Sequence, residues 1–157
     1  MNAYFAGGCF WCITPIFAIR KGVLKVTSGY SGGKEVNPTY KDVKAQKTGH
    51  RETIKVEYDE NVISYEKLLE IFLYNVDLYD SEGQYIDRGH SYTLAIYYID
   101  DNQKKIIDER LSKFDKKVCI AVEKFDKFYE AEEYHQDYYL KHPEEFEKEL
   151  ISSGRKK

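Results

Sequence analysis

The stretch Gly-Gly-Cys-Phe-Trp-Cys at residues 7–12 constrains this chain most, because it presents a thiol directly after a flexible turn. It follows the apolar run 3–6, which predicts a β-strand leading into a glycine turn. Where such a turn opens a helix, free N–H groups and the helix dipole lower the pKa of a cysteine. The stretch therefore predicts a reactive thiol at Cys9, within disulfide reach of Cys12 one helical turn away.

A Cys-x-x-Cys pair alone is compatible with a disulfide-exchange enzyme, a metal site or buried structural cysteines. A metal site is disfavoured because the chain has no second such pair and its four histidines are scattered. We therefore expect neither a metal ion nor a cofactor.

Composition indicates one globular domain over residues 1–157. The chain is 42% hydrophobic and 32% charged, and it is long enough to bury most of its apolar surface. The net charge is −3, and both signs are mixed along the chain, so the sequence does not predict a basic surface that binds nucleic acid. The longest nearly apolar run, 92–99, is far shorter than the ~18 residues of a membrane span.

Cysteine usage favours a reducing compartment. Three cysteines are an odd number in a chain that needs no disulfide framework. The first predicted strand starts directly after residue 2, so we expect no signal peptide. These features predict a cytoplasmic protein, and we expect it to be a monomer.

Apolar spacing after residue 12 predicts a helix whose start is ambiguous. Thr14 and Pro15 form a good N-cap and first-turn pair, which would leave Cys9 and Cys12 in a turn. Alternatively, the helix begins at Phe10 and tolerates Pro15 at the loss of one hydrogen bond. The next elements predicted are a strand over 23–30, a long polar loop to residue 50, a half-exposed strand over 53–58 and a helix capped by Ser64.

The second half of the chain alternates between apolar runs and polar segments. An irregular polar segment is expected over 77–91, and the runs 92–99 and 118–122 predict central strands with a helix between them. The tail from 130 to 150 has a helical pattern interrupted at Pro143. The predicted fold is α/β (α+β): a two-layer sandwich with a mixed sheet, a split βαβ (ferredoxin-like) core and a C-terminal helical tail.

Six motifs follow one another along nearly the whole chain. They are Gly-Gly-Cys-Phe-Trp-Cys at 7–12, Gly-Tyr-Ser-Gly-Gly at 29–33, Asn-Pro-Thr-Tyr at 37–40, Thr-Gly-His-Arg-Glu at 48–52, Ile-Ser-Tyr-Glu at 63–66 and Glu-Tyr-His-Gln-Asp-Tyr at 133–138. In these motifs and their order the chain resembles the A-type peptide methionine sulfoxide reductases. The resemblance implies a two-layer α/β fold and reduction of the S epimer of methionine sulfoxide, in proteins or as the free amino acid, to methionine.

The same resemblance implies a role for seven residues. Cys9 matches the nucleophile, and Phe10 and Trp11 match the aromatic wall that accepts the substrate methyl group. The other matches are the acid Glu52, the hydrogen-bond donors Tyr40 and Tyr92, and Asp87 as an anchor for substrate or water. Cys12 is not part of this match, and its spacing to Cys9 alone makes it the nearest candidate for a recycling thiol.

The chemistry of a sulfoxide explains these residue types. Its sulfur becomes electrophilic once the oxygen is protonated or hydrogen-bonded, and a soft thiolate is then a suitable attacker. The products are a thioether and a sulfenic acid on Cys9. Glu52 can supply the proton if the apolar wall raises its pKa, while the two tyrosines donate hydrogen bonds.

The chain departs from the family pattern at 76–79 and 93–94, which lie at the rim of the expected pocket. It also lacks the family's frequent C-terminal cysteine tail, so recycling must use Cys12, Cys119 or an external thiol. We predict a Cys9–Cys12 disulfide that thioredoxin or a similar dithiol opens. Cys119, within an apolar run, is predicted to be an inert core thiol, and His135 is given no chemistry.

Two competing functions share some of these features. A thioredoxin-like thiol-disulfide oxidoreductase would also use Cys-x-x-Cys after a strand, but two bulky aromatic residues between the cysteines and the missing first βα unit argue against it. A binding module that uses a tyrosine-rich surface would leave the Gly-Gly-Cys turn unexplained.

Overall fold

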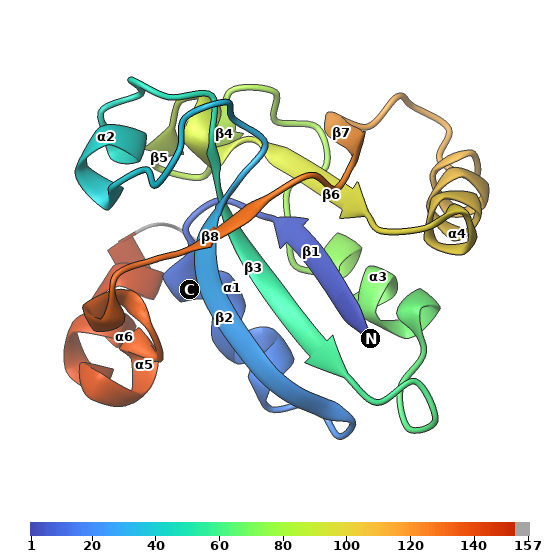
Figure 1. Cartoon of the computed structure of the whole chain (residues 1–157), viewed down its shortest axis with the longest axis horizontal. Coiled ribbons are helices and arrows are strands. Elements are labelled where there is room, and N and C mark those ends of the chain that lie inside the picture. The colour runs from blue at the N-terminus through green and yellow to red at the C-terminus, as the bar shows by residue number, and fades with distance from the viewer. Residues whose placement is uncertain (153–157) are drawn as a thin grey trace.

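The computed structural model describes residues 1–152, so the last five residues of the predicted domain lie outside the described part (Figure 1). One large sheet has the strand order β7-β6-β1-β3-β2-β8. β6 and β7 are parallel and all other neighbours are antiparallel, so the predicted mixed α/β fold is confirmed. Its strands are β1 (Asn2–Ala6), β2 (Val23–Ser31), β3 (Arg51–Tyr58), β6 (Leu94–Tyr98), β7 (Ile120–Lys124) and β8 (Phe128–Glu130).

The helices lie mainly on one side of this sheet. α1 joins β1 to β2 and α3 joins β3 to β6, and in both cases one other strand lies between the two that are joined. Within the described residues, no helix is both long and apolar enough to cross a membrane. The helices are α1 (Phe10–Ala18), α2 (Tyr40–Lys44), α3 (Tyr65–Tyr74), α4 (Asp101–Leu111), α5 (Tyr138–Lys141) and α6 (Pro143–Ser152).

Opposite faces of β1 pack into two separate apolar clusters. On the helix side, the Phe5 ring stacks on Phe17 of α1 at 5.4 Å and on Phe72 of α3 at 4.9 Å between centroids. On the other side, Tyr4 stacks on Phe125 at 4.0 Å. Figure 1 shows the segment from β7 to β8 crossing this second face. β1 is therefore covered on both faces, and the cysteine turn follows directly from its C-terminal end.

α1 settles the ambiguous helix start. It begins at Phe10 with Cys9 as N-cap residue, and Pro15 lies inside the helix. Thr14 does not cap it, because its hydroxyl donates to the carbonyl of Phe10 one turn earlier at 2.8 Å. Cys12 therefore belongs to the first turn of a regular helix and not to an adjustable loop.

α3 agrees with the sequence prediction in detail. Ser64 is its N-cap, and its hydroxyl accepts a hydrogen bond from the backbone N–H of Lys67 at 3.1 Å. The predicted apolar stripe is buried: Tyr65, Leu68, Leu69, Phe72 and Leu73.

Four predictions about the remaining segments are wrong. The apolar run 118–122 leads into β7, which is an edge strand and not a central one. Cys119 precedes β7 and is half-buried, so it is not a core thiol. The predicted polar loop that ends at residue 50 contains α2, whose N-cap is Thr39. The segment 77–91 contains a two-stranded sheet of β4 (Gly83–Gln84) and β5 (Asp87–Arg88) and the start of a 3-10 turn, η1 (His90–Tyr92).

Candidate active site

Cys9 lies at the N-terminus of α1 because two glycines turn the chain sharply after β1. Gly8 has a φ of 91°, a conformation that glycine adopts without strain. The thiol is 6% exposed. A hydrogen bond with the Cys12 side chain, together with burial, raises the pKa of Cys9 well above its ordinary value. The expected lowering of this pKa by the helix N-terminus is therefore wrong for the resting site, where Cys9 is a neutral thiol.

Glu52 is a buried carboxyl group on the central strand β3. One oxygen, Oε1, accepts a hydrogen bond from the backbone N–H of Phe10 at 3.1 Å, which ties Glu52 to the first residue of α1. The other, Oε2, is buried and has no hydrogen-bond partner among the described residues. Burial raises the pKa of Glu52 to about 8, and the charge of Asp87 acts in the same direction. Glu52 is therefore mostly protonated at neutral pH.

Two tyrosines and an aspartate complete the polar part of the site. Tyr40 begins α2 and Tyr92 ends η1, and burial followed by the charge of Glu52 raises the pKa of both phenols. Both hydroxyls therefore stay protonated and able to donate. Asp87 lies on β5, and its charge acts on Cys9 and on Glu52. Arg88, its neighbour in sequence, pairs instead with Asp80 at 2.6 Å.

Aromatic rings form one wall of the site. Phe10 is 1% exposed, and its ring lies 6.2 Å from the Tyr40 ring. Trp11 stacks on Tyr40 at 6.0 Å and on Tyr138 of α5 at 4.1 Å. Its indole N–H donates to Nδ1 of His135 at 3.1 Å. Trp11 is thus positioned by ring contacts with Tyr40 and Tyr138 and by the hydrogen bond to His135.

His135 and Glu132 belong to the site, although the sequence alone gave them no role. His135 is 1% exposed and packs on Tyr40 at 4.1 Å, and burial lowers its pKa to about 4, so it stays neutral and accepts from Trp11. Glu132 accepts from the hydroxyl of Tyr30 at 2.8 Å and from the backbone N–H of Tyr40 at 3.1 Å. The motif at 133–138 was the available signal, but its contacts with residues about a hundred positions away are not visible in periodicity.

All eight residues predicted from the sequence lie in one place: Cys9, Phe10, Trp11, Cys12, Tyr40, Glu52, Asp87 and Tyr92. Within residues 1–152, no group of three or more His, Cys, Asp or Glu side chains is arranged to hold a metal ion. The site therefore combines two thiols, a buried carboxyl group, two phenols and an apolar wall.

On a mixed α/β fold, the site brings together a neutral thiol, a protonated carboxyl group and an aromatic wall. This combination is that of a thiol-dependent oxidoreductase. The family model described as "Peptide methionine sulfoxide reductase" matches residues 1–157, and the chain belongs to this family. A curated relative from Bacillus licheniformis, named peptide methionine sulfoxide reductase MsrA, is 46% identical over 98% of this chain and 88% of its own length.

Solved structures agree with this assignment. Reduced Mxr1 from Saccharomyces cerevisiae has a TM-score of 0.83 at 28% identity, over 92% of this chain and 86% of that one. Mxr1 in complex with Trx2 has a TM-score of 0.55 at 20% identity, over 88% of this chain and 84% of that one, and shows a similar fold.

Proposed function

We propose that Cys9 reduces methionine sulfoxide in a thiol-dependent reaction in which Glu52 supplies the proton. One observation carries this proposal: a protonated carboxyl group is buried beside a thiol, and one of its oxygens has no hydrogen-bond partner in the described residues. A buried polar atom without a partner is costly, and a bound sulfoxide oxygen would satisfy it. As a member of its family, the chain is an oxidoreductase that acts on methionine sulfoxide.

The reducing step needs no proton from outside the site. Glu52 donates its proton to the sulfoxide oxygen as the sulfur of Cys9 attacks the substrate sulfur and forms an S–S bond. The resulting hydroxyl group then moves to the sulfur of Cys9, and the substrate S–O bond and the S–S bond break. Methionine leaves, and Cys9 carries the oxygen as a sulfenic acid. The proton lost by the Cys9 thiol restores Glu52. Because the carboxyl group is neutral before the attack, it does not repel the negative charge that develops on the sulfur of Cys9.

Substrate recognition is assigned to the remaining residues. Phe10 and Trp11 offer an apolar surface to the methyl group on sulfur, and this contact would select one epimer, the S form. Tyr40 and Tyr92 donate to the oxygen, whose negative charge grows in the transition state. Asp87 holds the substrate or an ordered water. We propose these roles for protein-bound and free substrate alike.

Cys12 is the proposed recycling thiol. Cys9 and Cys12 are the N-cap and third residues of α1, and the backbone N–H of Cys12 donates to the carbonyl of Cys9 at 3.1 Å. Their side chains are already hydrogen-bonded, so the helix need not loosen to bring them together. The sulfenic acid would condense with Cys12, releasing water and forming a disulfide. Cys119 lies beside β7 at the edge of the sheet, where its backbone N–H donates to the carbonyl of Leu78.

An external dithiol such as thioredoxin would then open this disulfide. Cys12 lines a groove of about 510 Å³ with apolar walls from α1, α3, α5 and α6, which offers a route for an attacking thiol. The complex of the related Mxr1 with Trx2 supports the same class of reductant. The thioredoxin-like alternative for this chain is disfavoured, because the family match and fold are those of the sulfoxide reductases. We further propose that the single domain acts as a cytoplasmic monomer.

Single-turnover analysis tests both the reduction and the recycling. Treating the reduced protein with methionine sulfoxide but no reductant should release about one methionine per chain and leave a Cys9–Cys12 disulfide, detected by peptide mass mapping. The variant Cys12→Ser should release the same amount but retain the sulfenic acid, trapped with dimedone. A Cys9–Cys119 disulfide, or undiminished thioredoxin-driven turnover in Cys12→Ser, would exclude Cys12 as the recycling thiol.

A further inference from the structure

One edge of β2 is only partly covered. Along its other edge β2 pairs with β3 from Val23 to Ser31, but on this edge it pairs with β8 only from Gly29 to Ser31. The last backbone contact is the N–H of Ala131, which donates to the carbonyl of Ser28 at 2.9 Å. Among the described residues, no strand pairs with this edge before Ser28, which is the arrangement that accepts an added strand in other proteins.

The side chain of Gln136 follows β8 along this edge of β2 and makes the hydrogen bonds that a paired strand would make. Its side-chain Oε1 accepts from the backbone N–H of Ser28 at 2.9 Å, and its Nε2 donates to the carbonyl of Ser28 at 2.9 Å. Backbone groups in a strand point alternately to the two sides. Because the N–H and carbonyl of Ser28 face this edge, those of Val26 face it as well, and they are the next positions that an incoming strand would bind.

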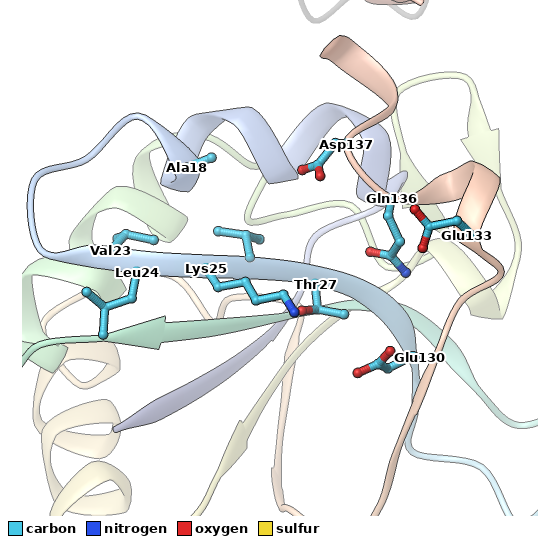
Figure 2. Close-up of a pocket in the computed structure, with 10 residues that line it drawn as sticks. Ala18, Val23, Leu24, Lys25, Thr27, Glu130, Glu133, Gln136 and Asp137 are labelled. Carbon is cyan, nitrogen blue, oxygen red and sulfur yellow. The ribbon is translucent and has the colours of Figure 1, made fainter. Parts of the chain in front are cut away.

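A groove of about 400 Å³ runs along this edge, between β2 and the segment that follows β8. Figure 2 shows side chains of β2 at its base and Glu133, Gln136 and Asp137 on the opposite wall. Thr27 lines the groove and is 3% exposed, and its buried hydroxyl has no hydrogen-bond partner among the described residues. A polar group of a bound ligand would satisfy this hydroxyl.

The lining of the groove is acidic. Glu130, Glu133 and Asp137 are exposed carboxylates, and Lys25 is the only cationic residue in the lining. Lys141 offsets part of this charge, because its Nζ lies 3.3 Å from an oxygen of Glu133. The groove therefore favours a positively charged occupant.

We propose that the open edge of β2 binds an extended, basic segment of a polypeptide substrate as an additional strand, next to the methionine sulfoxide being reduced. This inference rests on the proposed function. The groove ends at Gln136, and the preceding residue, His135, holds the indole of Trp11. A chain bound along β2 thus arrives at the wall of the candidate active site. Free methionine sulfoxide lacks such a segment and gains nothing from the groove.

Steady-state kinetics test the charge of the occupant. The substrates are free methionine sulfoxide and two peptides with a central methionine sulfoxide flanked by alternating threonine and either lysine or glutamate. The double variant Glu130→Lys, Glu133→Lys should raise KM for the lysine peptide about tenfold and leave kcat, and KM for the free amino acid, unchanged. The control Glu60→Lys, Glu109→Lys changes the net charge equally at exposed positions outside the groove and should alter KM for the lysine peptide less than twofold.

Backbone hydrogen exchange tests the added strand without catalysis. The lysine peptide, with methionine in place of the sulfoxide, should slow exchange of the Val26 amide at least tenfold at saturation, and the double variant should abolish this protection. The groove proposal is overturned, while the proposed function stands, if the peptide is a substrate but the Val26 amide is not protected and the double variant has the same KM for the lysine peptide as the wild type. If Val26 is protected but no sulfoxide is reduced, the groove binds polypeptide and the proposed function fails.

Discussion

Cys9→Ser should abolish reduction of methionine sulfoxide, lowering kcat by at least about 10³-fold. A serine hydroxyl has neither the accessible anion nor the soft nucleophilicity that attack on a sulfoxide sulfur requires. It also gives no sulfenic acid, so no disulfide can form with Cys12. The measurement is methionine release with dithiothreitol as reductant, which bypasses any need for a protein partner.

The matched control is Cys119→Ser. Cys119 is half-buried at the edge of the sheet, and its hydrogen bond to Leu78 comes from the backbone N–H, which serine retains. This variant should keep at least half of the wild-type kcat. Substantial turnover by Cys9→Ser would exclude Cys9 as the nucleophile, and loss of activity in both variants would point to a general effect of removing a thiol.

Glu52→Gln should slow the reduction step by ~10²–10⁴-fold, the usual contribution of a general acid. Glutamine keeps a similar shape and can still donate a hydrogen bond, but it cannot transfer a proton. Burial raises the pKa of Glu52 to about 8, so the required acid form dominates at pH 7 and is lost as pH rises through about 8. The wild-type single-turnover rate should therefore fall above pH 8, and this fall should be absent in Glu52→Gln.

Glu57→Gln is the control for this experiment. Glu57 lies on the same strand, β3, but opposite Asn2 near the far end of the pairing, and it is only half-buried. Its replacement should leave the rate and the pH profile unchanged. If single-turnover rates in Glu52→Gln matched the wild type across this pH range, the proton would come from another group.

Local signals predicted the elements that local interactions determine. α3 follows from Ser64 as N-cap and from an apolar stripe, and both act within a few residues of the chain. The strand at 118–122 was misplaced because an apolar run indicates burial but does not identify which strands lie beside it. β7 takes the sheet edge because it pairs only with β6. Its apolar side chains are half-buried there and pack against β6.

The electrostatics of the site were predicted for Glu52 but not for Cys9. The expectation that apolar surroundings raise the pKa of Glu52 agrees with the structure. The motif at 7–12 suggested an activated thiolate, whereas a hydrogen bond with Cys12 and burial hold Cys9 as a thiol. This effect comes from packing between α1, β3 and the loops, which no sequence spacing encodes. His135 was missed for the same reason, because its bond to Trp11 spans 124 positions.

The most direct test of the central claim uses the two epimers of N-acetylmethionine sulfoxide, separated and incubated with the protein and dithiothreitol. Chromatography then follows the thioether formed from each. We expect complete conversion of the S epimer and none of the R epimer, because in the proposed site one wall of aromatic rings receives the methyl group while Glu52 and the tyrosines hold the oxygen. Conversion of both epimers at similar rates, or of neither, would contradict the proposed function.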